Sequence, residues 1–160
     1  MGPGGLEPRM SLYLDASCLL KVLFPEPETA RVMQLIAAEQ QVVSSSLARL
    51  ETLVQIHGRG AGGLLKPVAV RSLIARLEVL LGQDPYEMVH TPAAAIEVAE
   101  EHLRRLPREA HCPTLDRLHL AAMEALHLRR LLTNDDAQAR AARTLGFAVI
   151  VPRPARSERR

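Results

Sequence analysis

The alternation of apolar and polar residues predicts a chain of short strands separated by helices. Short apolar or alternating runs have the period of two that is typical of strands, and segments with apolar residues three or four positions apart have the period of a helix. Strands are expected at 11–15, 41–44, 86–90, 130–133 and 147–151. Helices are expected at 16–23, at 28–40, from 45 or 46 to 57, at 68–81, at 91–106, from 113 or 114 to 128, and from 135 or 136 to 146.

Strands that are separated by helices need crossover connections, and these connections make neighbouring strands parallel. We therefore predict an α/β fold, a three-layer α/β/α domain with a mostly parallel central sheet. The chain of 160 residues is long enough to bury a core as one domain, and it has no internal repeat.

The two ends of the chain differ in composition from the middle. Residues 1–9 are polar and rich in Gly and Pro, without the hydrophobic stretch of a signal peptide. We expect them to be disordered, with the folded domain at 10–152 and a basic tail at 153–160. The tail has four Arg against Glu158, in a chain whose net charge is +2. Arg makes bidentate contacts with phosphate, so the tail suits RNA, although a solvated surface explains it equally well.

Composition narrows the class of protein. Apolar residues make up 48% of the chain, which is typical of a folded domain, and no apolar run approaches the roughly 18 residues of a membrane span. Two Tyr, two Phe and no Trp leave little for base stacking, so the core is expected to be Leu, Val, Ile and Ala. Cys18 and Cys112 lie among apolar residues and form neither a disulfide framework nor a metal-ligand spacing. A reducing, cytoplasmic location suits them.

The third expected helix is amphipathic, and a run of glycines follows it. Its inner side is expected to carry four apolar residues, Leu47, Leu50, Leu53 and Val54. The glycines at 58–63 predict a flexible break. This segment has a superficial look of a phosphate-binding loop, but it lacks GK[ST] and follows a helix, so the P-loop interpretation fails.

Four acidic residues fall where an open α/β sheet places its site, beyond the carboxyl ends of the strands. They are Asp15 at the end of the first strand, Asp135 after the fourth, Asp116 in the first turn of a late helix, and Glu51 early in the third helix. Asp116 and Asp135 are also ordinary at helix N-termini, where the helix dipole favours carboxylates. Asp15 is the hardest to explain otherwise, because a charge that ends an apolar strand is costly unless it is paired.

The segments that contain these acids resemble the PIN-domain nucleases, in particular the VapC-type toxins of bacterial and archaeal toxin–antitoxin pairs. The matching segments are LYLDASCLLKVL at 12–23, SSSLARLETL at 44–53, TLDRLHLAAM at 114–123 and LLTNDDAQARAARTLGFAVI at 131–150. Their order and spacing fit the family over residues 10–152. The resemblance implies a PIN-like fold and a Mg²⁺- or Mn²⁺-dependent endoribonuclease.

The resemblance further implies that Asp15, Glu51, Asp116 and Asp135 are the catalytic, metal-binding acids. Carboxylate oxygens without Cys or a required His suit Mg²⁺ or Mn²⁺ rather than Zn²⁺. One ion or two are both compatible with the sequence. Carboxylates about 5 Å apart repel by about 3 kcal/mol at an effective dielectric constant of about 20. Without metal, one of these carboxyl groups is therefore expected to have a raised pKa.

Five further residues are candidates for support of the site. Ser17 and Thr133 fall where the family has hydroxyl residues. Asn134 and Asp136 flank the last acid, and Asp136 is expected to begin the next helix, with assistance to the site as the alternative. His119 lies one turn after Asp116 on the same helix face. We expect it to pack between helices, and support of the acids is the alternative.

Partners follow from the resemblance as well. It implies a structured RNA substrate such as tRNA or rRNA, a homodimer, and a VapB-like antitoxin whose segment covers the site, often with an Arg that reaches the acids. The amphipathic segments 28–40 and 47–57 carry more apolar surface than one small sheet needs, which favours a dimer or a partner helix.

Two alternatives to the nuclease remain at this point. One is a PIN-like fold that acts mainly as an RNA- or protein-binding module with little or no turnover. The four acids argue against it, because a binding module has no need to keep their repulsion. The other is a Mg²⁺-dependent phosphatase or phosphoryl-transfer enzyme, which needs a second Asp two residues after Asp15, where this chain has Ser17.

Overall fold

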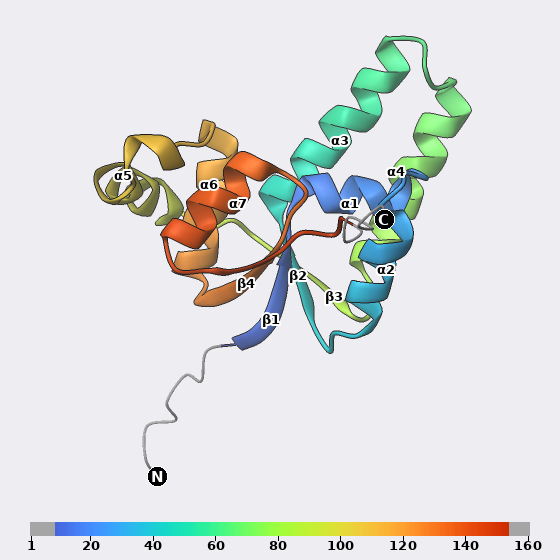
Figure 1. Cartoon of the computed structure of the whole chain (residues 1–160). Coiled ribbons are helices and arrows are strands. Elements are labelled where there is room, and N and C mark those ends of the chain that lie inside the picture. Colours follow the sequence, from blue (N-terminus) through green and yellow to red (C-terminus); the bar gives the residue numbers. More distant parts are fainter. Residues whose placement is uncertain (1–8, 154–160) are drawn as a thin grey trace, which may run out of the picture.

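The computed structural model describes residues 9–153 and has three layers, with helices on both faces of a five-stranded parallel sheet (Figure 1). The strands are β1 (Arg9–Leu14), β2 (Val42–Ser45), β3 (Tyr86–Val89), β4 (Leu128–Leu132) and β5 (Ala148–Ile150). The helices are α1 (Ala16–Leu23), α2 (Thr29–Ala37), α3 (Ser46–Ala61), α4 (Pro67–Leu81), α5 (Ala95–Arg105), α6 (Thr114–Ala125) and α7 (Asp136–Thr144), with a 3-10 turn at Arg108–Ala110. The predicted α/β/α fold is confirmed, and the sheet is entirely parallel.

Alternate side chains of β1 enter two separate cores, one on each face of the sheet. Leu12 and Leu14 pack with α1, α2, α3 and α4 on one face. Tyr13 faces the other side and packs with α6 and α7. Both patterns follow from the period of two along a strand, and they make β1 the buried centre of the domain.

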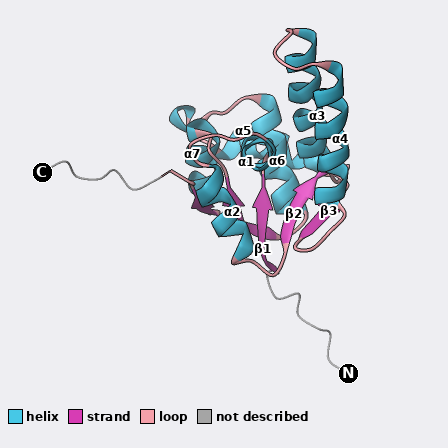
Figure 2. Ribbon diagram, turned by 90° about the vertical axis from the view of Figure 1, so that its right-hand side faces the viewer, coloured by secondary structure: helices cyan, strands magenta, loops and turns pink. Residues whose placement is uncertain are grey.

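The strand order β3-β2-β1-β4-β5 places a topological switch between β1 and β4. From β1 the chain moves outward to β2 and β3 on one side, and then returns to β4 and β5 on the other. Figure 2 shows β1, β2 and β3 side by side, with their carboxyl ends toward the helices. Ligands of open α/β sheets bind at such a switch, so the carboxyl ends of β1 and β4 are where a site is expected.

Helix α3 differs from its prediction in two ways. It continues through Gly58 and Gly60 to Ala61, so the break predicted at 58–63 is confined to its last two residues, Gly62 as the C-cap and Gly63 with a φ of 76°. A Cβ atom at Gly60 would lie 2.8 Å from Cγ2 of Val70, so the glycine allows α3 and α4 to approach closely.

The buried face of α3 also differs from the prediction. It is formed by small or polar residues and one isoleucine, namely Ala48, Thr52 and Ile56. The side chains of Leu50 and Val54 are 57% and 58% exposed, so their predicted inward orientation is wrong. The helix is turned so that its small residues approach the sheet, and part of its apolar surface is left uncovered.

Three predicted boundaries move for local reasons. The helix predicted from residue 91 begins at Ala95, because Thr91 is engaged with α3: its hydroxyl accepts from the Leu47 backbone N–H at 3.2 Å. Helix α6 ends at Ala125, and His127 takes a positive φ of 58° that turns the chain into β4. Arg9 already belongs to β1, while residues 1–8 and 154–160 of the predicted disordered segment and basic tail lie outside the described residues.

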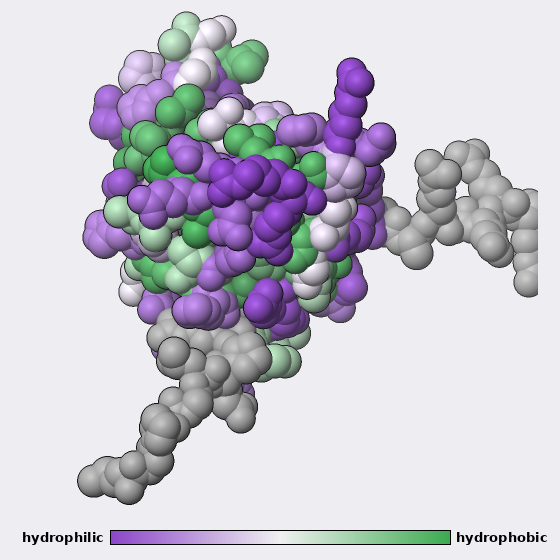
Figure 3. Space-filling view, turned by 90° about the vertical axis from the view of Figure 1, so that its left-hand side faces the viewer, coloured by the Kyte–Doolittle hydropathy of each residue, from purple (hydrophilic) through white to green (hydrophobic). Residues whose placement is uncertain are grey.

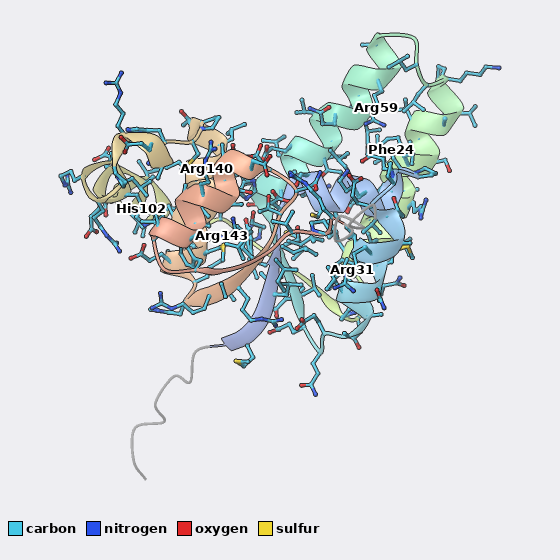
Figure 4. The ribbon with its side chains drawn as sticks, viewed as in Figure 1. Phe24, Arg31, Arg59, His102, Arg140 and Arg143 are labelled. Atoms are coloured by element: carbon cyan, nitrogen blue, oxygen red, sulfur yellow. The ribbon has the colours of Figure 1, made fainter. Side chains whose placement is uncertain are left out.

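The outer surface is mostly polar where the helices face solvent. Figure 3 shows hydrophilic residues gathered across the face on the left-hand side of Figure 1. The exposed side of α5 contributes charged residues there, including Glu97, Glu100, Glu101, Arg104 and Arg105. On the opposite side of the molecule, Arg59 of α3 lies over the ring of Phe24, with the guanidinium carbon 3.9 Å from the ring centroid (Figure 4). Within residues 9–153, no helix is long and apolar enough to cross a membrane.

Candidate active site

Asp15 joins the end of β1 to the start of α1. It is the N-cap of α1, and its Oδ1 accepts hydrogen bonds from the Cys18 backbone N–H at 3.1 Å and from the Ser17 hydroxyl at 2.7 Å. Its Oδ2 accepts from the Thr133 hydroxyl at 2.6 Å. The residue is 4% exposed. Burial raises the pKa of this carboxyl group above its usual value, although the hydrogen bonds from Thr133 and Ser17 act in the opposite direction.

Asp135 occupies the equivalent place after β4, the strand that pairs with β1. It is the N-cap of α7, and its Oδ1 accepts from the Gln138 backbone N–H at 2.7 Å. The backbone N–H of Asp135 donates to the Thr133 hydroxyl at 3.1 Å. Thr133 thus links the two strand-end acids, because the same hydroxyl contacts Asp15.

Asp116 lies in the first turn of α6, as predicted, and approaches the other acids from a different layer. Its pKa is raised from 3.8 to about 6, first by burial and then by the negative charges of Asp135 and Asp15. The predicted repulsion within the cluster therefore raises the pKa of Asp116. The pKa of Asp15 is raised by burial.

Glu51 lies in the second turn of α3, six residues after the N-cap Ser45. Its Oε1 pairs with Nε2 of His119, which lies on α6 and is 1% exposed. The contact joins α3 to α6 across the carboxyl end of the sheet.

One pocket of about 220 Å³ contains all four predicted acids. Its walls come from α1, α3, α6 and the start of α7, and its lining residues are Asp15, Ala16, Ser17, Leu20, Glu51, Gln55, Asp116, His119 and Asp135. The pocket opens at the switch between β1 and β4, where the strand order predicted a site.

A comparison with known families and structures identifies the fold. A family model of the PIN domain matches residues 12–144. The chain belongs to the PIN-domain family.

A curated relative of this PIN-domain protein is a ribonuclease. Ribonuclease VapC46 of Mycobacterium tuberculosis (strain ATCC 25618 / H37Rv) is 33% identical over 144 residues, which cover 89% of this chain and 98% of that relative. This match makes the chain a homologue of the VapC-type ribonuclease toxins. The family and the enzyme class that the sequence predicted are thereby confirmed.

Two solved structures share the fold at low sequence identity. VapC20 of Mycobacterium tuberculosis, a Sarcin-Ricin loop cleaving toxin, has a TM-score of 0.63 and 18% identity, over 86% of this chain and 96% of that chain. The VapBC2 complex of Rickettsia felis was solved bound to a DNA fragment from the promoter of VapBC2. It has a TM-score of 0.66 and 14% identity, over 89% of this chain and 98% of that chain.

The supporting residues predicted from the sequence separate into two groups. Ser17 and Thr133 hold Asp15, and the Ser17 hydroxyl also accepts from the backbone N–H of Asn134 at 3.1 Å. Asp136 does not line the pocket. It is the first residue of α7, as expected, and pairs at 2.8 Å with Arg153.

His119 departs from the sequence expectation. It is buried between α6 and the sheet, but it also lines the pocket and contacts Glu51. The alternative interpretation, support of the acids, therefore describes its position in this PIN domain better than packing alone.

Three residues of the site were missed in the sequence. The fully buried Gln138 lies with its Oε1 2.8 Å from the Thr133 hydroxyl, and an acid followed three residues later by Gln is a capping-box pattern that could have drawn attention to it. Gln55 lines the pocket one turn after Glu51, where helical spacing places it on the same face. No local signal marks Tyr13, whose hydroxyl lies 2.6 Å from Nδ1 of His119.

The donor set fits a hard divalent cation. Within residues 9–153, no three His, Cys, Asp or Glu side chains form a preformed metal cage. Mg²⁺ is commonly held by one or two carboxylates and keeps several of its waters. A pocket of about 220 Å³ has room for such waters, since each occupies about 30 Å³. Carboxylate oxygens and water are also the ligands that suit Mg²⁺ and Mn²⁺.

Proposed function

We propose that this PIN-domain protein is a Mg²⁺- or Mn²⁺-dependent endoribonuclease whose metal-binding acids are Asp15, Glu51, Asp116 and Asp135. The observation that carries the proposal is the convergence of four carboxylates from four elements on one pocket. Burial disfavours the ionised forms of Asp15 and Asp116, and repulsion by neighbouring acids adds to this effect at Asp116, as the raised pKa values of the two groups indicate. A divalent cation relieves this cost, whereas a protein that only binds RNA gains nothing from it.

Each residue of the pocket has a distinct task in this proposal. Asp15 accepts hydrogen bonds from three donors, which orient its carboxylate at the end of β1. Asp116 makes no side-chain hydrogen bond among the described residues, so its oxygens are available to a ligand. A divalent cation held by these carboxylates would supply polarisation of the scissile phosphate and a lowered pKa for a water molecule at the site.

The substrate is proposed to be a structured RNA such as tRNA or rRNA. The relative VapC20 is a Sarcin-Ricin loop cleaving toxin, which supports this class of substrate. Arg140 and Arg143 are exposed on α7, the helix whose N-cap is Asp135, and their guanidinium groups suit phosphate contacts (Figure 4). Action on such RNA would take place in the cytoplasm.

A VapB-like antitoxin is the proposed protein partner. The structural relative from Rickettsia felis is a VapBC2 complex, which supports a partner of this kind. The pocket is acidic, so a basic side chain of the partner, such as an Arg, would pair with the carboxylates and block the metal site.

A homodimer is proposed to form through α3 and α5. Leu50 and Ile96 are 57% and 56% exposed, and both border an apolar groove of about 340 Å³ that also includes Leu47 and Leu118. Protruding apolar side chains next to an apolar recess are self-complementary, which is what a two-fold contact between identical chains requires.

The test of the proposed function combines metal binding with RNA cleavage. Wild type and Asp15→Asn are titrated with Mn²⁺ by calorimetry and assayed on tRNA and rRNA with Mg²⁺ or with EDTA. Saturable binding and cleavage are expected for wild type, and both should fall at least about 100-fold in Asp15→Asn. Glu101→Gln, on the exposed side of α5, is the control and should behave as wild type. Cleavage that persists in EDTA or in Asp15→Asn would contradict the proposal, and RNA binding without cleavage would favour the binding module.

A further inference from the structure

Glu51 differs from the two strand-end acids in how it is held. Asp15 and Asp135 are both N-caps and accept backbone N–H groups of their own helices. Glu51 has a longer side chain, and its one hydrogen bond among residues 9–153 is with His119. A free Glu side chain loses rotamer entropy when it is fixed, so a neighbouring group must hold it if it is to act as a ligand.

His119 is itself fixed by two buried residues. Its Nδ1 lies 2.6 Å from the hydroxyl of Tyr13, and the two rings meet edge to face with centroids 5.8 Å apart. The Tyr13 hydroxyl also lies 2.7 Å from Oγ of Ser45, which accepts the Ala48 backbone N–H at 3.2 Å. Tyr13 and Ser45 are both 0% exposed, so water does not compete for these groups.

Only one direction of hydrogen bonding satisfies every donor in this chain of groups. Ser45 accepts from Ala48 and donates to Tyr13, Tyr13 donates to Nδ1 of His119, and Nε2–H of His119 donates to Glu51. In this direction Nε2 of His119 carries the proton that Glu51 accepts, and Nδ1 is the acceptor of the Tyr13 hydroxyl. In the opposite direction, the Ser45 hydroxyl has no acceptor among residues 9–153, and a nitrogen lone pair faces the Glu51 carboxylate.

We propose that His119 is a positioning residue that holds the Glu51 carboxylate in the acidic pocket, and that Tyr13 fixes the tautomer of His119 that does so. This series of hydrogen bonds begins at the N-cap of α3, passes through β1 and α6, and ends at Glu51 of α3. It therefore fixes the relative position of these elements as well as the Glu51 side chain. The inference rests on the proposed function, because Glu51 is taken there as a metal ligand.

The first measurement is Mn²⁺ titration of Tyr13→Phe, His119→Leu, His119→Gln and Glu51→Gln, beside wild type. Loss of a residue that orients a metal ligand commonly weakens metal binding by 10- to 100-fold. Tyr13→Phe and His119→Leu should each weaken Mn²⁺ binding by at least about 10-fold. His119→Gln keeps an N–H donor and should recover part of the loss. The double variant His119→Leu/Glu51→Gln should bind no more weakly than Glu51→Gln, since both changes remove one interaction.

The chain provides a matched control in His102. This residue is also 0% exposed, and its Nε2 pairs with a glutamate, Glu124, but the pair lies between α5 and α6 outside the pocket. His102→Leu therefore removes a comparable buried His–Glu contact. It should lower the melting temperature as His119→Leu does, and it should leave Mn²⁺ affinity at the wild-type value.

A second measurement does not depend on metal. The ¹⁵N shifts of the His119 ring in EDTA should show the Nε2–H tautomer in wild type and a mixture of tautomers in Tyr13→Phe. An Nδ1–H tautomer, or wild-type Mn²⁺ affinity in both Tyr13→Phe and His119→Leu while Glu51→Gln binds weakly, would overturn the positioning role and leave the nuclease intact. Absence of Mn²⁺ binding in wild type, with the Nε2–H tautomer present, would instead overturn the metal site.

Discussion

Asp116 shows how a single carboxyl group connects the pocket to the stability of the protein. Its pKa is raised to about 6 in the folded state, first by burial and then by Asp135 and Asp15. A folded-state pKa above the unfolded value of 3.8 means that the folded protein binds the proton more tightly. The resulting stabilisation is complete below about pH 4 and is lost as the pH rises through about 6. Ionised Asp116 is therefore destabilising at neutral pH in the absence of metal.

Asp116→Asn should consequently stabilise the metal-free protein at pH 8. We expect a gain of up to about 2 kcal/mol in the free energy of unfolding, after allowance for the partial exposure of the group. The gain should vanish near pH 4, where the wild-type carboxyl is already protonated. Urea unfolding in EDTA at pH 4, 6 and 8 measures it. If the difference in the free energy of unfolding between variant and wild type stayed constant with pH, the pKa of Asp116 would not be raised in the folded protein.

The hairpin of α3 and α4 depends on one close approach between helices. Gly60 faces Val70 with no room for a Cβ atom, whereas a Cβ atom at Gly58 on the same helix would have no neighbour within 4 Å. Both glycines lie within α3, so both carry the same intrinsic cost of Gly in a helix.

Gly58→Ala and Gly60→Ala form a matched pair that tests this packing. Gly58→Ala should raise the free energy of unfolding by about 0.5–1 kcal/mol, since alanine favours the helix. Gly60→Ala should show no such gain, because the methyl group meets Val70 and forces the helices apart. Urea denaturation of the two variants gives the comparison. An equal gain at both positions would mean that α3 and α4 are not in close contact.

The folded domain leaves apolar side chains of α3 and α5, such as Leu50 and Ile96, exposed on its surface. If that surface joins two copies, wild type should have the mass of a dimer in analytical ultracentrifugation. Leu50→Glu places a charge in the proposed contact and should raise the dissociation constant at least about 10-fold. Val79→Glu is the matched control, because Val79 is 64% exposed on α4 and does not line the apolar groove that contains Leu50 and Ile96. A wild-type monomer at high concentration, or equal effects of the two variants, would reject this interface.

The order of elements and the places of the acids were predictable from the sequence because they depend on local signals. Strand and helix periods, and the acids that end strands or begin helices, are properties of adjacent residues. Once the sheet is parallel, Asp15 and Asp135 must lie at the same edge, whatever the details of packing. The same reasoning predicted the acidic pocket and the raised pKa of one of its members.

The rotation of α3 and the connections within the pocket were decided by tertiary structure. Both faces of α3 carry apolar residues, and packing against α1, α4 and the sheet selects Ala48, Thr52 and Ile56 for burial. Tyr13 and His119 are 106 residues apart in the chain, so no local pattern links them. Contacts of this kind depend on how whole elements pack, and small side chains allow a close approach that hydrophobicity alone does not predict. For this reason the sequence predicted which acids form the pocket, and the folded chain determined how Glu51 is held there.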